Sequence, residues 1–118
     1  MSDAAAHTGN RWRTLRSSRD VRRVMTRGTR TSGELVVVYV SGDPGKTRAG
    51  FATPRAVGGA VGRNRARRVM KEAWRAVAPE AAEGYGLMIV ARPEMRDAKT
   101  QRVAEDLRSV LRSAGVIP

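Results

Sequence analysis

The chain has 118 residues, enough for one domain with a modest core and too few for two. Its 23 Lys and Arg residues against 11 Asp and Glu residues give a formal net charge of +12, so we expect a polyanionic partner. The absence of cysteine excludes disulfides and thiolate metal sites, and no apolar run approaches the roughly 18 residues of a membrane span, so we expect a cytoplasmic protein with no membrane partner.

The first predicted element is a short helix. Residues 1–10 are small and polar, so we expect a disordered leader before a single domain over 11–118. Ser17 is placed to cap the helix, and Asp20 lies at the third helical position, close to a capping-box arrangement. Gly28 is expected to end the helix in the left-handed conformation.

The apolar face of this helix consists of Val21, Val24 and Met25. A helix of about ten residues does not hold together in isolation, so it must dock on another part of the domain. Its other faces are strongly positive because of eight surrounding arginines: Arg11, Arg13, Arg16, Arg19, Arg22, Arg23, Arg27 and Arg30.

Three strands are predicted after this helix. The segment 34–40 is rich in β-branched residues and is followed by the turn signal "SGDPG", so a hairpin-like loop is expected to join it to a second strand, 47–53. A third strand covers 86–92. Asp97 is then expected to cap a last helix, in which apolar residues recur at helical spacing, and Gly115 to end it.

The segment "GGAVGRNRARRVMKEAWR" between the second and third strands predicts a helix entered through a glycine-rich loop. The loop lacks the Lys-Ser/Thr of a nucleotide P-loop and the spacing of a dinucleotide fingerprint, so nucleotide binding is not favoured. At about 100° per residue, six apolar residues fall in an arc of about 140°, which predicts a stripe facing the core. They are Ala66, Val69, Met70, Ala73, Trp74 and Val77.

The opposite side of this helix is basic, over an arc of about 100°. It carries Asn64, Arg67, Arg68, Lys71 and Arg75. Cations four residues apart repel by a few tenths of a kcal/mol per pair, and cations early in a helix oppose its dipole. A solvated helix face usually interleaves both signs, whereas here one acid, Glu72, lies just outside the arc. This local conflict favours a nucleic-acid surface over an ordinary solvated face, with DNA or RNA left open.

No catalytic centre is indicated. A protein nuclease needs a general base, a cation at the transition state or a metal held by carboxylates. The single histidine, His7, lies in the leader, and the acids are scattered. Asp97, Glu105 and Asp106 are interpreted as a helix cap and a solvated helix face. We therefore expect neither catalytic residues nor a metal site within the protein.

Three segments, "LRSSRDVRRVMTRG", "RAGFATPRAVGGAVGRNRARRVMKEAWR" and "LMIVAR", resemble the protein component of bacterial ribonuclease P in order and spacing. The resemblance implies a two-layer α/β (α+β) sandwich of order αβββαβα, like the second domain of ribosomal protein S5. Its sheet would be mixed and four-stranded, with a left-handed crossover, where chain rules alone favour a right-handed one. The fourth, short strand is implied by the resemblance only.

The resemblance also implies a function. In this family the protein binds a catalytic RNA, which removes the 5′ leader of precursor tRNA with Mg²⁺ held by the RNA. The implied partners are therefore the catalytic RNA and precursor tRNA, with no cofactor in the protein alone and no further protein required. The positions that match the family's surface for the catalytic RNA are Arg55, Arg63, Asn64, Arg65, Arg67, Arg68, Lys71 and Arg75.

A cleft for the single-stranded leader is implied between the first helix and the sheet, at Val21, Met25, Tyr39, Arg48 and Phe51. Val21 and Met25 stand where the family usually has phenylalanine, so neither offers an aromatic face, and a purely core role for both is the alternative. Leader binding would then be weaker, unless Tyr39 or Phe51 compensates.

Two other functions stay open. A ribosomal or chaperone-like protein with the same type of sandwich would bind structured RNA without altering the cleavage of precursor tRNA. A DNA-binding module is third, because no second helix is placed to form a helix-turn-helix with 63–77.

Overall fold

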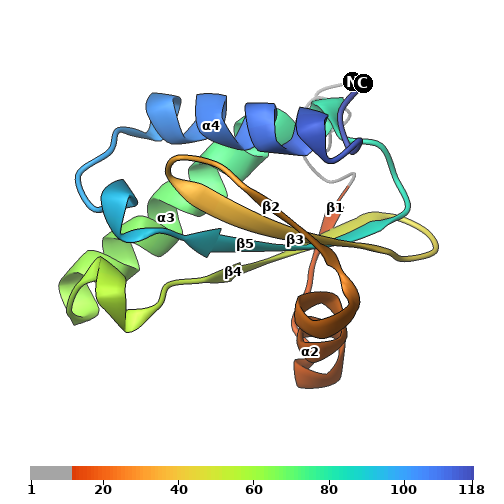
Figure 1. Ribbon diagram of the computed structural model, residues 1–118, viewed down its shortest axis with the longest axis horizontal. Coiled ribbons are helices and arrows are strands. Elements are labelled where there is room, and N and C mark those ends of the chain that lie inside the picture. The colour runs from red at the N-terminus through yellow and green to blue at the C-terminus, as the bar shows by residue number, and fades with distance from the viewer. Residues whose placement is uncertain (1–11) are drawn as a thin grey trace, which may run out of the picture.

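A five-stranded mixed sheet forms the middle of the structure, a computed structural model that describes residues 12–118 (Figure 1). The expected disordered leader, 1–10, lies outside the described residues. The strand order is β1-β4-β5-β3-β2, with β1/β4 and β4/β5 parallel and β3/β5 and β2/β3 antiparallel. The strands are β1 (Trp12–Thr14), β2 (Thr29–Ser32), β3 (Val36–Gly42), β4 (Thr47–Ala52) and β5 (Tyr85–Ala91).

Helices cover both faces of the sheet unequally (Figure 1). The helices α3 (Ala60–Val77) and α4 (Thr100–Ser113) pack side by side on one face, and α2 (Ser18–Arg27) lies alone on the other. The mixed α/β class is therefore confirmed, whereas the expected two layers are three, because α2 covers the second face of the sheet. The chain passes from β4 through α3 to the parallel neighbour β5, so a crossover connection is present, and the left-handedness that the resemblance implied stays a prediction.

The expected number of strands was wrong, because the sheet has five and not four. The additional strand is β1, three residues that pair with the outer edge of β4 from Trp12↔Thr47 to Thr14↔Ala49. The short strand that only the resemblance implied is β2, which forms a true hairpin with β3.

The hairpin expected between the predicted strands 34–40 and 47–53, which correspond to β3 and β4, was also wrong. The loop 43–46 joins β3 to β4, but β5 lies between the two strands and pairs with both. The loop therefore spans two strand spacings, about 10 Å. β5 can occupy the middle because its residues are mostly buried on both faces, as a central strand requires.

The larger core lies between the sheet and the α3/α4 layer. All six residues of the predicted α3 stripe are buried, and Trp74 has no exposed surface, so its assignment to the core is confirmed. On the sheet, Val36, Val38 and Val40 of β3 face this layer, since side chains alternate along a strand. Burial of each such aliphatic side chain contributes about 1.5 to 3 kcal/mol.

A smaller core lies between α2 and the opposite face of the sheet. Its buried members are Leu15, Val24 and Met88. Ser17 caps α2 as predicted, accepting from the backbone N–H of Asp20 at 3.4 Å. Gly28 follows the helix with φ −73°, so the predicted left-handed stop was wrong. Glycine is needed there for close approach, because a Cβ would lie 2.4 Å from the carbonyl oxygen of Val24.

The start of α4 differs from the prediction in two respects. Asp97 does not cap the helix, whose N-cap residue is Lys99, without a side-chain hydrogen bond. Asp106 is not on a solvated face but is 7% exposed. Its carboxylate accepts backbone N–H groups of Glu34 at 3.0 Å, Leu35 at 2.8 Å and Val36 at 3.1 Å.

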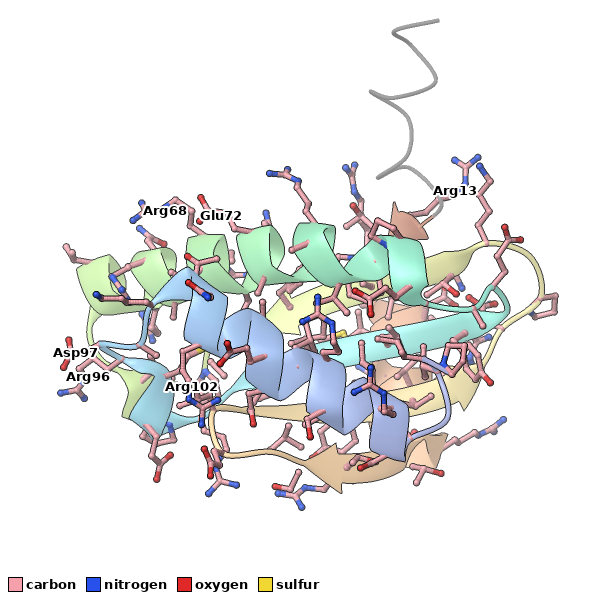
Figure 2. All side chains as sticks on the ribbon, turned by 90° about the horizontal axis from the view of Figure 1, so that it is seen from above. Arg13, Arg68, Glu72, Arg96, Asp97 and Arg102 are labelled. Carbon is pink, nitrogen blue, oxygen red and sulfur yellow. The ribbon has the colours of Figure 1, made fainter. Side chains whose placement is uncertain are left out.

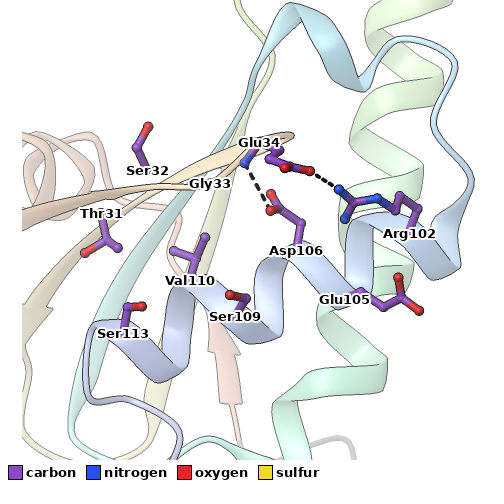
Figure 3. Close-up of a pocket in the computed structure, with 10 residues that line it drawn as sticks. All are labelled: Thr31, Ser32, Gly33, Glu34, Arg102, Glu105, Asp106, Ser109, Val110 and Ser113. Atoms are coloured by element: carbon purple, nitrogen blue, oxygen red, sulfur yellow. Dashed lines mark hydrogen bonds and ion pairs between the residues drawn. The ribbon is translucent and has the colours of Figure 1, made fainter.

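Asp106 thereby joins α4 to the turn of the β2–β3 hairpin. Figure 3 shows its side chain directed at this turn, with Glu34 directed toward Arg102, its ion-pair partner. A hollow of about 540 Å³ lies beside the joint. Of the three acids that line it, Glu34, Glu105 and Asp106, the buried Asp106 is already occupied by three backbone donors and Glu34 is paired with Arg102, so we interpret the hollow as part of a structural joint.

Candidate nucleic-acid interface

The basic face of α3 forms a continuous exposed surface. Its five predicted members, Asn64, Arg67, Arg68, Lys71 and Arg75, line one hollow of about 400 Å³ together with Glu72. All six residues are exposed. Figure 2 shows Arg68 and Glu72 directed outward from α3. The helical period places these side chains together because the opposite stripe of α3 is committed to the core.

Glu72 does little to neutralise this surface. It is the one acid that lines the hollow, and its Oε1 accepts the hydroxyl of Thr100 at 3.2 Å. Four cations, Arg67, Arg68, Lys71 and Arg75, therefore face solvent beside a single carboxylate. None of the four has an ion-pair partner within residues 12–118. Such a field attracts a polyanion, and guanidinium groups offer two parallel donors to a phosphate.

Arg65 differs from its neighbours because its guanidinium is already used. Nη1 donates to the carbonyl oxygen of Arg96 at 2.8 Å, and Nη2 donates to that of Ala98 at 3.0 Å. Arg65 is half-buried and holds the segment that precedes α4 against α3. The structure therefore places it beside the basic face and not on it. Contact of Arg65 with RNA stays a prediction.

Arg67 lies at the other flank of the basic face and ties it to the sheet. Nη1 donates to the carbonyl oxygen of Phe51 at 3.3 Å, and Nη2 donates to the hydroxyl of Thr53 at 3.2 Å. Phe51 is the penultimate residue of β4, and Thr53 directly follows the strand. Arg67 stays exposed, so these bonds orient its side chain without removing it from solvent.

The remaining predicted residues lie at the amino end of α3. Arg55 is exposed in the 3-10 turn Arg55–Val57, and Arg63 is half-buried in the first turn of the helix. Arg96 holds the 3-10 turn in place, because its Nε donates to the carbonyl oxygen of Val57 at 2.8 Å. Arg55, Arg63 and the basic face thus follow one another along the loop and the helix.

The predicted leader cleft is brought together in part. Val21, Met25 and Tyr39 are half-buried and pack around the smaller core between α2 and the sheet. Each keeps some exposed surface, so neither the core role nor the binding role is excluded for Val21 and Met25. Among the side chains that the structure describes, Tyr39 is the one aromatic residue of this cluster.

Phe51 does not belong to this cluster, and its placement in the cleft was wrong. It packs against the larger core on the α3/α4 side of the sheet. Its neighbour Ala52 packs against the smaller core on the α2 side. The reason is the two-residue period of a strand, which sends adjacent side chains of β4 to opposite faces. Phe51 therefore cannot compensate for a missing aromatic beside Tyr39.

Arg48 lies on the α2 side, but two carboxylates hold its guanidinium. Nε donates to Oδ2 of Asp43 at 2.6 Å, and Nη1 donates to Oδ2 of Asp20 at 2.9 Å. The hydrogen bond that Arg48 donates to Asp43 raises the pKa of Arg48, and burial opposes this only in part. Arg48 consequently stays charged, and it fastens the start of α2 to the loop that precedes β4.

Two further cations, which the sequence places among the arginines around the first helix, lie beside the cluster of Val21, Met25 and Tyr39. Arg30 lies on β2 directly opposite Tyr39, and Arg13 lies on β1 opposite Arg48. Directly paired residues share a face of the sheet, so both arginines border the α2 side. Both are exposed. Only the strand register reveals their position, and the register was not predictable without β1 and β2.

The described residues contain neither a metal-binding cluster nor a membrane-spanning helix. Across residues 12–118, no group of three or more His, Cys, Asp and Glu side chains is arranged to hold a metal ion. Within the same part of the chain, no helix combines the length and apolar character needed to cross a membrane.

Comparisons with known proteins agree on one family. The family model described as Ribonuclease P matches residues 10–115. The ribonuclease P protein component of Pelotomaculum thermopropionicum is 37% identical over 103 residues, 86% of this chain and 92% of the relative. That of Chloroflexus aurantiacus is 39% identical over 106 residues, 88% of this chain and 78% of the relative. The solved structure of the RNase P protein from Thermotoga maritima superposes with a TM-score of 0.76 at 23% identity, covering 85% of this chain and 96% of that one.

Proposed function

Because this chain belongs to the ribonuclease P protein family, as a protein component that works with an RNA subunit, we propose that α3 binds the catalytic RNA and the α2 side of the sheet binds the 5′ leader of precursor tRNA. The RNA carries out the cleavage with Mg²⁺ that it holds itself. The protein supplies binding and charge, and no further protein is required.

The basic face of α3 supports this proposal most directly. Arg68, Lys71 and Arg75 are exposed, unpaired within the described residues and placed on one side of a helix whose other side is buried. Cations that replace the counterions of RNA phosphates release those ions, which favours binding at low salt. Most hydrogen bonds of such an interface go to phosphate oxygens, so this surface would position the RNA more than it reads sequence.

The α2 side of the sheet supports the second part. It combines one half-buried aromatic residue, Tyr39, with exposed arginines at its border, Arg13 and Arg30. Stacking on an aromatic ring together with a basic surround is how proteins bind single strands without strong sequence preference. With Val21 and Met25 at the helix positions, Tyr39 is the one ring of this cluster on which a leader base stacks.

Charge is the contribution that we expect the protein to make to cleavage. Phosphates of the catalytic RNA and of precursor tRNA repel each other, and either Mg²⁺ or protein cations can screen this repulsion. The protein would therefore lower the Mg²⁺ concentration that the RNA needs.

A reconstitution tests the proposal. Cleavage of a 5′-extended precursor tRNA is measured at limiting Mg²⁺ with the protein alone, with the catalytic RNA of the same organism alone, and with both. We expect efficient cleavage only by the mixture, and less of it with Arg68→Ala than with Arg112→Ala, which removes the same charge from the exposed side of α4. A protein that binds RNA tightly but leaves cleavage unchanged would instead be a general RNA-binding protein.

A further inference from the structure

The outer face of α2 carries a second arginine stripe, which the proposed function does not use. Arg19, Arg22, Arg23, Thr26 and Arg27 fall in an arc of about 140° at about 100° per residue, directly opposite the apolar residues that face the sheet. Together with Ser18 they line a hollow of about 480 Å³. The stripe is therefore a shaped surface and not a scatter of separate side chains.

Counterions for this stripe are nearly absent. The one acid of α2, Asp20, is bound by Arg48 at 2.9 Å and lies 3.6 Å from Arg23. Arg19, Arg22 and Arg27 are exposed and have no ion-pair partner within residues 12–118. Their charges are thus available to an outside anion.

The arrangement is unfavourable for the helix by itself. Arg19 and Arg23, and then Arg23 and Arg27, are four residues apart, a spacing at which like charges destabilise a helix. α2 has only ten residues, so it has little stability of its own to offset this repulsion. A bound polyanion would remove the conflict.

The position of α2 indicates which polyanion it meets. Figure 1 shows α2 alone on its side of the sheet, so the side of the helix turned away from the sheet is uncovered by any other element in the picture. The inner side of the same helix supplies Val21 and Met25 to the cluster around Tyr39. A single-stranded nucleic acid that lies against this cluster and continues past α2 would meet the arginine stripe next.

We propose that the outer face of α2 binds the sugar-phosphate backbone of leader nucleotides upstream of those held beside Tyr39. This inference rests on the proposed function, because it takes the leader as the occupant of the α2 side. Three arginines without ion-pair partners in residues 12–118 suit phosphate oxygens, and the stripe offers no aromatic ring for stacking, so the contact would depend on leader length and salt and not on leader sequence.

Leader length provides the test. Binding of the assembled enzyme, in Ca²⁺ or another ion that prevents cleavage, is measured for mature tRNA and for precursors with leaders of about 5 and about 20 nucleotides, chosen around the 4 to 16 nucleotides that single-strand sites typically cover. The variant is Arg19→Ala/Arg22→Ala/Arg27→Ala, in which alanine favours the helix. The control, Lys99→Ala/Arg102→Ala/Arg112→Ala, removes three charges from exposed positions at α4.

We expect the wild type and the control to bind the long leader about tenfold more tightly than the short one at low salt, and the α2 variant to lose most of this gain while its affinity for the short leader is unchanged. A gain that survives in the α2 variant overturns the inference, as does a wild type without any gain from lengthening. The inference is also overturned if the α2 variant loses as much affinity for mature tRNA, or for the catalytic RNA alone, as for the long-leader precursor. The stripe would then bind an RNA other than the leader.

The same data separate this inference from the proposed function. If even the short leader adds nothing over mature tRNA in the wild type, the leader does not occupy the α2 side, and the proposed function fails in that part. If the short leader adds affinity and the long one adds no more, the proposed function stands and only the α2 stripe is excluded.

Discussion

A Cβ atom on Gly33 would lie 2.5 Å from Oδ2 of Asp106, closer than a side chain can approach without a shift. The same atom would lie 2.6 Å from Cγ2 of Val110. The hairpin turn and α4 therefore meet as closely as a glycine permits. This contact lets one carboxylate reach three consecutive backbone N–H groups.

Asp106→Ala should destabilise the fold by about 2 to 4 kcal/mol, because three backbone donors lose a charged acceptor and two of them are buried. Urea unfolding followed by circular dichroism measures this. Glu105→Ala is the matched control, since the neighbouring side chain is exposed, and it should change stability by less than about 0.5 kcal/mol. Equal effects of the two substitutions would contradict the role given to Asp106.

Arg65→Ala and Arg68→Ala should differ although both remove one arginine from the same helix. Arg65→Ala removes the two hydrogen bonds to the carbonyl oxygens of Arg96 and Ala98. This should lower the free energy of unfolding by about 1 to 2 kcal/mol and speed amide exchange in the segment before α4. Arg68→Ala should leave stability and exchange unchanged.

The affinity for the catalytic RNA should distinguish the same two variants in the opposite order, with the larger loss in Arg68→Ala. Arg68→Ala should weaken binding by about 1 to 3 kcal/mol at low salt and reduce the salt slope by about one. Measurement of affinity at several salt concentrations decides this. An unchanged affinity and slope for Arg68→Ala would remove it from the interface.

Tyr39→Leu and Phe51→Leu compare one ring on each side of the sheet. Tyr39→Leu should lower affinity of the assembled enzyme for leader-bearing precursor more than for mature tRNA, by about 1 to 3 kcal/mol if a base stacks there. Phe51→Leu should leave the ratio of the two affinities unchanged, because Phe51 packs against the larger core. An equal loss for both substrates with Tyr39→Leu would exclude Tyr39 from the leader site.

Arg48→Met should destabilise the fold by about 1 to 3 kcal/mol, since the buried Asp43 and the nearby Asp20 lose the closer of their two shared cations. Arg23 remains, but at 3.9 Å from Asp43 and 3.6 Å from Asp20. Because the pKa of Arg48 is raised in the folded state, its contribution is present throughout the neutral range and, on the alkaline side, is lost only in strongly alkaline solution. The stability difference should therefore be constant between about pH 6 and 9. Asp43→Asn in the Arg48→Met background should restore part of it.

The parts of the fold that could be predicted are those with a strong local pattern. The six-residue apolar stripe predicted the buried side of α3, and continuous apolar runs predicted β3 and β5, because burial on one or two faces imposes these patterns. The basic face of α3 followed from the same wheel. In each case the signal lies within a single element.

The parts that could not be predicted depend on pairing between distant segments. β1 and β2 are three and four residues long, and the sequence "TRTS" of β2 is almost wholly exposed, so neither has a hydrophobic period to read. The insertion of β5 between β3 and β4 is likewise a property of the whole sheet. Without this register, Phe51 was assigned to the wrong face.

Arg65 shows where a finer reading of one element would have helped. On the helical wheel it lies about 40° from Val69, at the edge of the apolar stripe, and about 60° from Arg68. This position beside the core is a signal for an arginine that contacts its own protein. The partner carbonyls of Arg96 and Ala98, however, come from a segment more than 30 residues away and were not predictable.

The alternation along β4 restricts where the chain can change in length. Arg48, Gly50 and Ala52 face α2, while Ala49 and Phe51 face the larger core. One inserted residue within β4 would exchange the two sets and place Phe51 against α2. The loop 43–46, by contrast, has three exposed residues after Asp43. Insertions and deletions among relatives are therefore expected in this loop and not within Thr47–Ala52.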